Sequence, residues 1–179
     1  MNPTDILFEH YPPDATLTRT LLHHCEQVRD KALAIARKVA HLKPDLGFIA
    51  EAAMLHDIGI YRTAAATLGC RGTAPYIRHG IIGRQILEQY GLRHHALVCE
   101  RHVGVGISRQ EIRDRRLPLP LRDMLPTSLE EIIICYADKF FSKSNGGTHH
   151  SPEAVIAELQ TFGREQVDRF LGWHRLFAG

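Results

Sequence analysis

The sequence predicts an all-α protein, and three observations indicate this class. Apolar residues recur at three- and four-residue steps through much of the chain, which is the periodicity of one helical face. Residue pairs typical of helix starts precede several of these segments. A convincing apolar alternation of period two is missing, although half-buried strands would require it. The length of 179 residues suits a single domain over 1–179, with its core at about 17–145 and a C-terminal helical extension at about 151–175.

The first half of the chain predicts two helices. One is a long amphipathic helix from Leu17 to Leu42, in which the apolar residues fall on one face. The second is apolar nearly all round and runs from about Leu46 to Ile58. Asp45 is its expected N-cap, and Gly59 is expected to end it in the left-handed conformation.

The middle of the chain predicts a loop and then two packed helices. The segment "YRTAAATLGCRGTAP" at 61–75 contains glycines and a proline and predicts a loop. A third helix follows over 77–90 and stops at Gly91, and a shorter fourth helix in "HHALVCERHVGVGI" ends before Gly104. Ser108 and Glu111 then form a capping box for a further short helix.

The last third predicts an irregular crossing followed by two helical segments. Residues 117–126 contain several prolines and are expected to be irregular. A second capping box, Thr127 with Glu130, opens the apolar helix "SLEEIIICYADKFFSKS". After the loop "NGGTHH", Ser151 and Pro152 begin a final helix that Gly163 is expected to interrupt.

Composition excludes several classes of protein. The net charge of +2 gives no reason to expect a long nucleic acid as partner. No apolar segment approaches the roughly 20 residues that a membrane span needs, and the start lacks the features of a secretory signal, so we expect a cytoplasmic protein. The four cysteines form no CxxC pair and are expected to be reduced core residues: Cys25, Cys70, Cys99 and Cys135.

Several ionisable residues fall where burial is expected. His24 borders the apolar face of the first helix, the pair His56 and Asp57 lies at the end of the second, and Asp138 lies on the apolar stripe of its helix. His79 opens the third helix, and His102 closes the fourth. Taken singly, each has an ordinary structural explanation, such as a satisfied core histidine or a carboxylate paired with a lysine. Taken together, they indicate a cation site, since buried carboxylates are costly unless paired or coordinated, and imidazole with carboxylate suits divalent transition metals.

The ordered set His24, His56–Asp57 and Asp138, with "HDIG" at 56–59, resembles the HD superfamily of metal-dependent phosphohydrolases over about residues 20–145. This resemblance implies that the four residues hold a divalent cation at the centre of a helical bundle. "RHGIIGRQIL" and "VCERHVG" are similar to the segments that contribute histidines to a second cation in dinuclear members. His79 and His102 would be those ligands, with Asp57 bridging two ions drawn from Fe, Mn, Ni, Co or Mg.

The resemblance also implies the chemistry. A hydroxide held between two cations would hydrolyse a phosphoester or phosphoanhydride bond of a small phosphorylated substrate, with Asp57 as the catalytic residue that orients it. The layout is similar to that of HD hydrolases that split diadenosine tetraphosphate, which favours a nucleotide as the substrate. Whether the protein forms a homodimer is left open. The predicted substrate contacts are the basic residues nearest in sequence to the metal ligands, although such residues are often simply solvated: Arg62, Arg78, Arg109 and Lys139.

Two other functions stay open at this point. Some HD proteins with four histidines and two aspartates are di-iron oxygenases, and the spacing of the ligands does not separate them from hydrolases. Other HD domains are non-catalytic nucleotide-binding modules, for which the loss of ligands would be typical. Cyclic-dinucleotide phosphodiesterases of the HD-GYP type are disfavoured, because Ile60 replaces the usual lysine after "HDIG" and the GYP triplet is missing.

Overall fold

The computed structural model describes residues 2–13, 15–143 and 149–177. Over these ranges it contains nine α-helices and four short 3-10 helices, and its β-type pairing is limited to isolated bridges. The predicted all-α class is therefore confirmed. Among the described residues no helix combines the length and apolar character that crossing a membrane would require.

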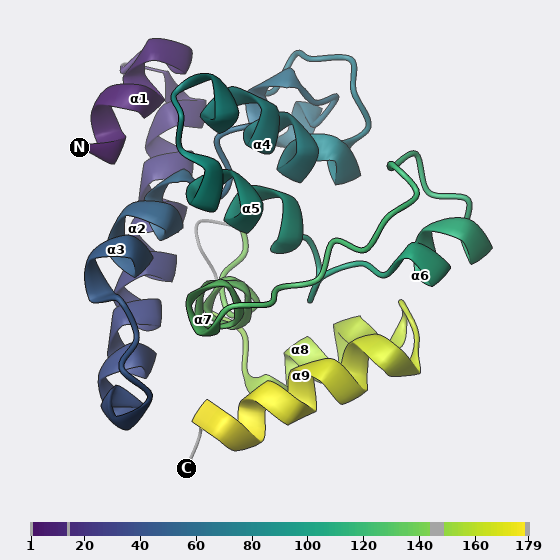
Figure 1. Cartoon of the computed structure of the whole chain (residues 1–179). Coiled ribbons are helices and arrows are strands. Elements are labelled where there is room, and N and C mark those ends of the chain that lie inside the picture. The colour runs from purple at the N-terminus through teal and green to yellow at the C-terminus, as the bar shows by residue number, and fades with distance from the viewer. Residues whose placement is uncertain (1, 14, 144–148, 178–179) are drawn as a thin grey trace.

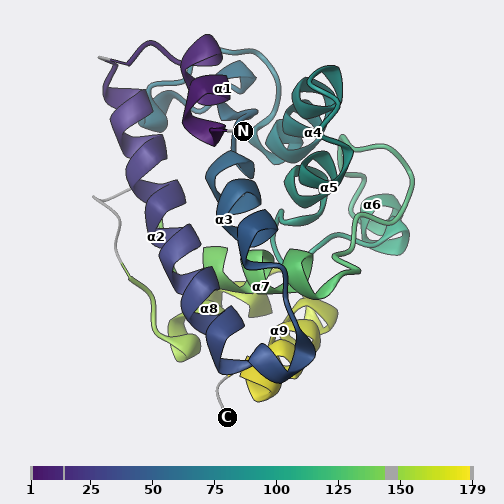
Figure 2. The same cartoon turned by 60° about the vertical axis from the view of Figure 1, so that its left-hand side comes forward.

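The N-terminal helices form one side of the molecule. The helix α1 (Pro3–His10) precedes α2 (Thr16–Lys38), and α3 (Leu46–Leu55) lies beside α2 in both views of the chain (Figures 1 and 2). The helix α1 was not predicted from the sequence. This helix buries Ile6 and Leu7, and it leads into Tyr11, whose hydroxyl donates to the carbonyl oxygen of Ile58 at 2.8 Å. This hydrogen bond holds the N-terminal segment against the turn that follows α3.

The helices α4 (His79–Gln89) and α5 (Arg93–Arg101) pack closely against one another. Gly80 and Gly83 allow this approach, because a Cβ atom at either position would press on Cys99 of α5. Gly91 ends the α4 region with φ of +73°, as the sequence predicted.

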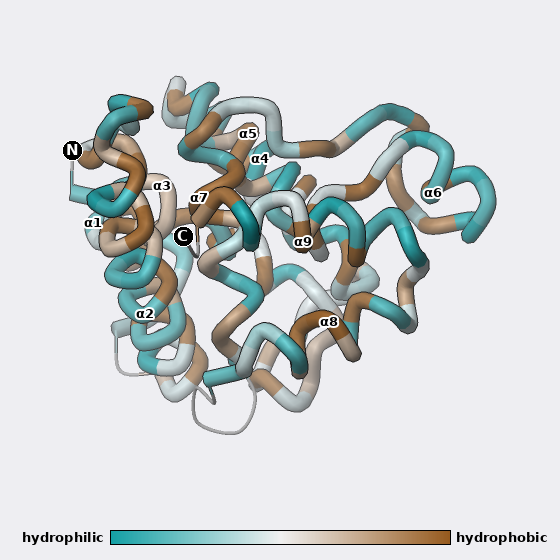
Figure 3. The backbone as a smooth tube through the Cα atoms, turned by 90° about the horizontal axis from the view of Figure 1, so that it is seen from below, coloured by the Kyte–Doolittle hydropathy of each residue, from teal (hydrophilic) through white to brown (hydrophobic). Residues whose placement is uncertain are grey.

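The helix α6 (Arg109–Asp114) lies on a hydrophilic arm that projects from the bundle (Figures 1 and 3). Its predicted capping box is present, with Ser108 Oγ accepting from the Glu111 amide at 3.1 Å. The helix α7 (Leu129–Asp138) begins one residue later than predicted. Its N-cap is Ser128, whose Oγ accepts from the Glu131 amide at 3.1 Å, so the prediction of Thr127 with Glu130 was wrong by one position.

The chain closes with α8 (Pro152–Gln160) and α9 (Arg164–Phe177), which pack together below α7 in Figure 1. Ser151 caps α8 as predicted, and Gly163, with φ of +125°, separates the two helices. The predicted loop at 145–150 falls partly on residues 144–148, which lie outside the described residues.

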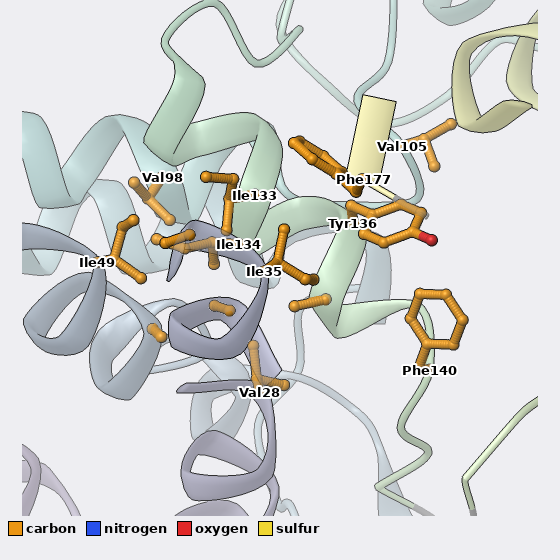
Figure 4. Packing of buried hydrophobic residues seen from close by; sticks show 14 of the residues in the cluster. Val28, Ile35, Ile49, Val98, Val105, Ile133, Ile134, Tyr136, Phe140 and Phe177 are labelled. Atoms are coloured by element: carbon orange, nitrogen blue, oxygen red, sulfur yellow. The ribbon is translucent and has the colours of Figure 1, made fainter. Parts of the chain in front are cut away.

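Two large apolar clusters fill the bundle. The first gathers side chains from α2, α3, α5, α7, α8 and α9, among them Ile35, Ile49, Ile133 and Phe177 (Figure 4). The second joins α1 to α2, α3, α4 and α5. Along α2, Cys25 belongs to the second cluster and Val28 to the first. His24 thus enters the interior near the junction of the two clusters.

A candidate metal centre at the helix ends

The six predicted ligand residues meet in the interior, and all six are buried. Five of them lie at or just past helix ends: His56 and His102 are the C-cap residues of α3 and α5, Asp57 follows His56, His79 begins α4, and Asp138 ends α7. His24 alone lies within a helix, on the buried face of α2. Convergence of helix ends lets side chains from distant segments reach one point without crossing the apolar layers.

The first group of donor atoms comes from α2, α3 and α7. His24 Nε2 lies 3.3 Å from His56 Nε2 and 3.0 Å from Asp138 Oδ1. Asp57 Oδ2 lies 3.4 Å from His24 Nε2 and 3.2 Å from His56 Nε2. Donors about 2.1 Å from a single ion would be separated by about 3.0–3.4 Å, so this spacing fits one divalent cation.

The second group of donor atoms comes from α4 and α5. His79 Nε2 lies 3.1 Å from His102 Nε2. Asp57 Oδ1 lies 3.4 Å from His79 Nε2 and 3.3 Å from His102 Nε2. Asp57 therefore turns one carboxylate oxygen toward each histidine pair. Asp57 Oδ1 and Asp138 Oδ1 are buried without a well-formed hydrogen bond, and bound cations would supply the partner that these oxygens lack.

Backbone carbonyls fix the orientation of three of the histidine rings. Nδ1 lies 2.7 Å from the Ala53 oxygen in His56, 2.7 Å from the Tyr76 oxygen in His79, and 2.8 Å from the Cys99 oxygen in His102. A carbonyl oxygen only accepts, so each Nδ1 is the donor. In the neutral ring Nε2 then carries a lone pair toward the centre, as a metal ligand requires.

The two histidine groups differ in their charge balance. Burial lowers the pKa of His79 to about 3 and also lowers the pKa of His102, so both rings stay neutral. Burial likewise opposes a charge on His56, but the carboxylates of Asp57 and Asp138 outweigh it and hold its pKa well above the ordinary value. Without a metal, a proton on His56 therefore offsets part of the carboxylate charge.

The carboxylates also remain charged. Burial would raise the pKa of the Asp57 carboxyl, but Lys143 and His56 outweigh burial and hold that pKa well below the usual range. Lys143 and the histidine His24 do the same for the pKa of Asp138. The centre thus holds two ionised carboxylates in a desolvated cluster, where protonated His56 and Lys143 balance their charge.

Gly59 has a different role from the predicted one. Its φ is −82°, so the expectation of a left-handed residue was wrong, and α3 already ends at Leu55 rather than at Ile58. A Cβ atom at position 59 would collide with the carbonyl oxygen of His79 and the amide nitrogen of Gly83. Gly59 is required because the first turn of α4 lies directly on it, which brings His79 to Asp57.

A cleft of about 650 Å³ opens onto the centre, with His79, His102 and Asp138 at its floor. Lys143 reaches this floor, and its Nζ lies 2.7 Å from Asp57 Oδ2. Lys143 is not among the contacts predicted from the sequence, although it lies five residues after Asp138. His150 also lines the cleft.

The predicted substrate contacts separate into two sets. Lys139 lines the cleft, with its Nζ 3.8 Å from Asp138 Oδ2. Arg62, Arg78 and Arg109 have exposed side chains that are not among the described residues lining the cleft. Arg62 instead donates from Nε to the Tyr61 hydroxyl at 2.8 Å. Proximity in sequence to a ligand does not direct a side chain on a helix surface toward the centre.

The C-terminal helices build one wall of the cleft. The cleft is lined by Leu159 of α8, by Phe162 between the two helices and by Gln166 of α9. Gln166 Nε2 donates to the Gly106 oxygen at 2.9 Å, and Gln166 Oε1 accepts from the Val105 amide at 3.3 Å. These bonds tie α9 to the loop that follows His102.

In comparison with known families, a model of the HD domain matches residues 21–142. The chain belongs to the HD-domain family. The HD superfamily consists of metal-dependent phosphohydrolases, and its members bind divalent metals. The matched range includes all six residues of the centre and ends before α8. The cleft wall formed by α8 and α9 is therefore an addition to the matched HD domain.

Three relatives illustrate the range of proteins similar to this HD domain. An uncharacterized protein of Methanocaldococcus jannaschii is 32% identical over 157 residues, covering 78% of this chain and 85% of that protein. A tRNA (cytidine(56)-2'-O)-methyltransferase of Thermoplasma volcanium is 30% identical over 176 residues, covering 97% of this chain but only 45% of the methyltransferase. A protein of the same name from Picrophilus torridus is 32% identical over 124 residues, covering 68% of this chain and 31% of that protein. No solved structure gives a significant match.

Proposed function

We propose that this chain is a two-metal phosphohydrolase that acts on a nucleotide-type substrate. The observation that carries the proposal is the pair of neutral imidazoles of His79 and His102, whose Nε2 atoms face each other at 3.1 Å. Each Nδ1 already donates to a carbonyl, so both Nε2 atoms present lone pairs, and Asp57 Oδ1 adds a negative charge beside them. Such an arrangement is repulsive unless a cation lies between the donors.

In this proposal, His24, His56 and Asp138 hold the first cation, and His79 with His102 hold the second. Asp57 serves both through its two carboxylate oxygens, and for this reason we assign it the catalytic role. A pair of divalent cations supplies a nucleophile at neutral pH and offsets charge on the phosphoryl oxygens. The residues themselves fix the donor atoms, exclude bulk water from the floor of the cleft and keep both carboxylates ionised.

Positive charge beside the centre supports a phosphorylated substrate. Lys139 and Lys143 line the cleft within reach of the carboxylates, and an ammonium group there would bind phosphoryl oxygens that extend past the cations. Of the predicted contacts we retain Lys139 and add Lys143. Arg62, Arg78 and Arg109 have exposed side chains away from the described cleft lining, so the geometry gives them no support as contacts.

The outer part of the cleft supports a substrate with a flat organic group. Apolar and aromatic side chains line it, and the guanidinium of Arg115 lies 5.3 Å from the ring centre of Phe162. A guanidinium and an aromatic ring at the mouth, with phosphate-binding groups at the floor, match the two ends of a nucleotide. The names of the two tRNA-modifying relatives suggest including nucleotides and short oligonucleotides derived from RNA among the compounds tested.

The decisive test pairs metal content with phosphate release. Protein purified without chelators or a histidine tag would be analysed by elemental mass spectrometry and incubated with nucleoside mono-, di- and triphosphates, dinucleoside polyphosphates and short RNA. About two equivalents of metal with phosphate release would support the proposal. Oxygen consumption by the iron-loaded protein without hydrolysis would favour a di-iron oxygenase. Nucleotide binding that needs no metal would favour a non-catalytic module.

A further inference from the structure

The ammonium group of Lys143 contacts a carboxylate oxygen that the first cation would need. Nζ lies 2.7 Å from Asp57 Oδ2 and 4.0 Å from Asp138 Oδ1. Those two oxygens are the carboxylate donors of the first group, facing His24 and His56. The lysine side chain is only 13% exposed, so its charge is held inside the protein.

A metal ion and this ammonium group would compete for the same carboxylate oxygen. A cation bound to Asp57 Oδ2 would lie about 2.0–2.2 Å from that oxygen. The ammonium would then be a like charge in direct contact with the same oxygen, in a site where burial weakens screening. The two positive charges therefore repel each other in this desolvated cluster, and each weakens the binding of the other.

We propose that Lys143 is the internal counter-ion of the metal-free centre and has to withdraw from Asp57 before the first cation binds. This inference rests on the proposed two-metal function. In the metal-free protein the lysine pairs with carboxylates that would otherwise be buried without a cation. In the metal-bound protein it is released toward the cleft that it lines, where a phosphorylated substrate would meet it. Lys143 is in this sense a positioning residue that sets the metal affinity.

The consequence is a lowered metal affinity in the native sequence. A site that is open for only a fraction of the time binds its ligand more weakly by that same fraction. Removing the ammonium therefore leaves the carboxylates free for the metal and should strengthen binding. It should also weaken the metal-free fold, because the buried carboxylates lose their partner.

The test compares Lys143→Met with the matched control Lys139→Met. Both substitutions remove one cleft lysine near Asp138, but only Lys143 contacts Asp57. Mn²⁺ affinity would be measured by competition with a fluorescent chelator, and thermal unfolding would be followed with and without Mn²⁺. We expect Lys143→Met to bind the first Mn²⁺ at least about tenfold more tightly than the wild type. Its melting temperature should fall in EDTA and recover with Mn²⁺, whereas Lys139→Met should change little.

Other outcomes would overturn the inference. Unchanged or weaker Mn²⁺ binding by Lys143→Met would do so, as would an equal gain in both variants, which would indicate a general charge effect. Should Lys143→Met not fold without metal, both proteins would be purified with Mn²⁺ and the rate of metal release to the chelator compared; release as fast as from the wild type would count against the inference. If the wild type binds two metals and hydrolyses substrate but Lys143→Met does not behave as expected, only the inference about Lys143 is disproved. If the wild type binds no metal, both this inference and the proposed function are disproved.

Discussion

His79 and His102 face each other through Nε2 atoms 3.1 Å apart, and the Nδ1 atom of each ring donates to a carbonyl oxygen of its own local turn. Two segments more than twenty residues apart thus present two lone pairs to one point. Asp57 Oδ1 completes that point at 3.4 and 3.3 Å from the two nitrogens.

The second cation should depend on this histidine pair. His79→Ala or His102→Ala is expected to lower the metal content from about two equivalents to about one, because His24, His56 and Asp138 remain for the first cation. Elemental mass spectrometry of the purified variants measures this. His94→Ala, an exposed residue of α5, is the control and should retain both metals. Two bound metals and full turnover in the His79 and His102 variants would show that the centre is not dinuclear in the way we propose.

Asp57 should be needed at both positions. Because its two oxygens face the two histidine pairs, Asp57→Ala is expected to reduce occupancy of both cations and to lower phosphate release by about a hundredfold or more. Asp138→Ala removes a donor from the first group only and should leave the second cation largely bound. Equal metal loss in the two variants, determined by elemental analysis, would contradict a bridging role for Asp57.

The metal-free protein should be most stable near the pH at which free histidine titrates. Burial lowers the pKa of His79 from 6.5 to about 3, so acidification below 6.5 protonates the unfolded chain first and reduces stability. Asp57 and Asp138 raise the pKa of His56 well above 6.5, so its contribution is fully present below 6.5 and is lost as the pH rises through that higher value. Thermal unfolding in EDTA between pH 4 and pH 10 would reveal this maximum.

The same protonation predicts how metal binding depends on pH. Binding requires neutral His56, so the cation displaces its proton and the apparent affinity should increase as the pH rises through the neutral range. Calorimetric titrations in buffers of different ionisation enthalpy would detect the released proton. Affinity that is independent of pH would mean that His56 is already neutral in the metal-free centre.

Gly59 should be intolerant of even one methyl group. Gly59→Ala would press on the His79 carbonyl and on Gly83, so we expect a loss of about 2–4 kcal/mol in the free energy of unfolding, together with loss of the second metal. Urea unfolding measures the first effect. Gly172→Ala is the matched control: that glycine lies within α9 with open space around its Cβ position, so alanine should stabilise the helix by about 0.5–1 kcal/mol.

The wall contributed by the C-terminal helices should determine substrate binding without affecting the metals. Phe162→Ala removes the ring that faces the Arg115 guanidinium, and it is expected to raise KM for a nucleotide by about tenfold while leaving metal content unchanged. Steady-state kinetics measures the change. Phe8→Ala on α1, a similarly exposed phenylalanine outside the cleft lining, should leave KM unaltered.

The sequence by itself predicted the helical class, most helix starts and the six residues that meet at the centre. These features depend on local patterns: an apolar period, a serine before a helix, or a histidine and an aspartate at a helix end. The ordered set of His24, His56, Asp57 and Asp138 also carried the resemblance to the HD family, which the match over residues 21–142 confirms. Local patterns failed where a neighbour from elsewhere decided the outcome, as at Gly59, which α4 covers.

Only the tertiary structure decided which charged side chains reach the centre. Three arginines lie near the ligands in sequence, yet Lys143 is the residue that contacts Asp57. Phe162 lines the cleft although it lies outside the matched domain. The physical reason is that a side chain's target is set by the packing of its helix against others, which sequence distance does not record. Likewise, only the folded chain shows that Asp57 divides its two oxygens between two histidine pairs, because that division depends on four separate segments meeting at one carboxylate.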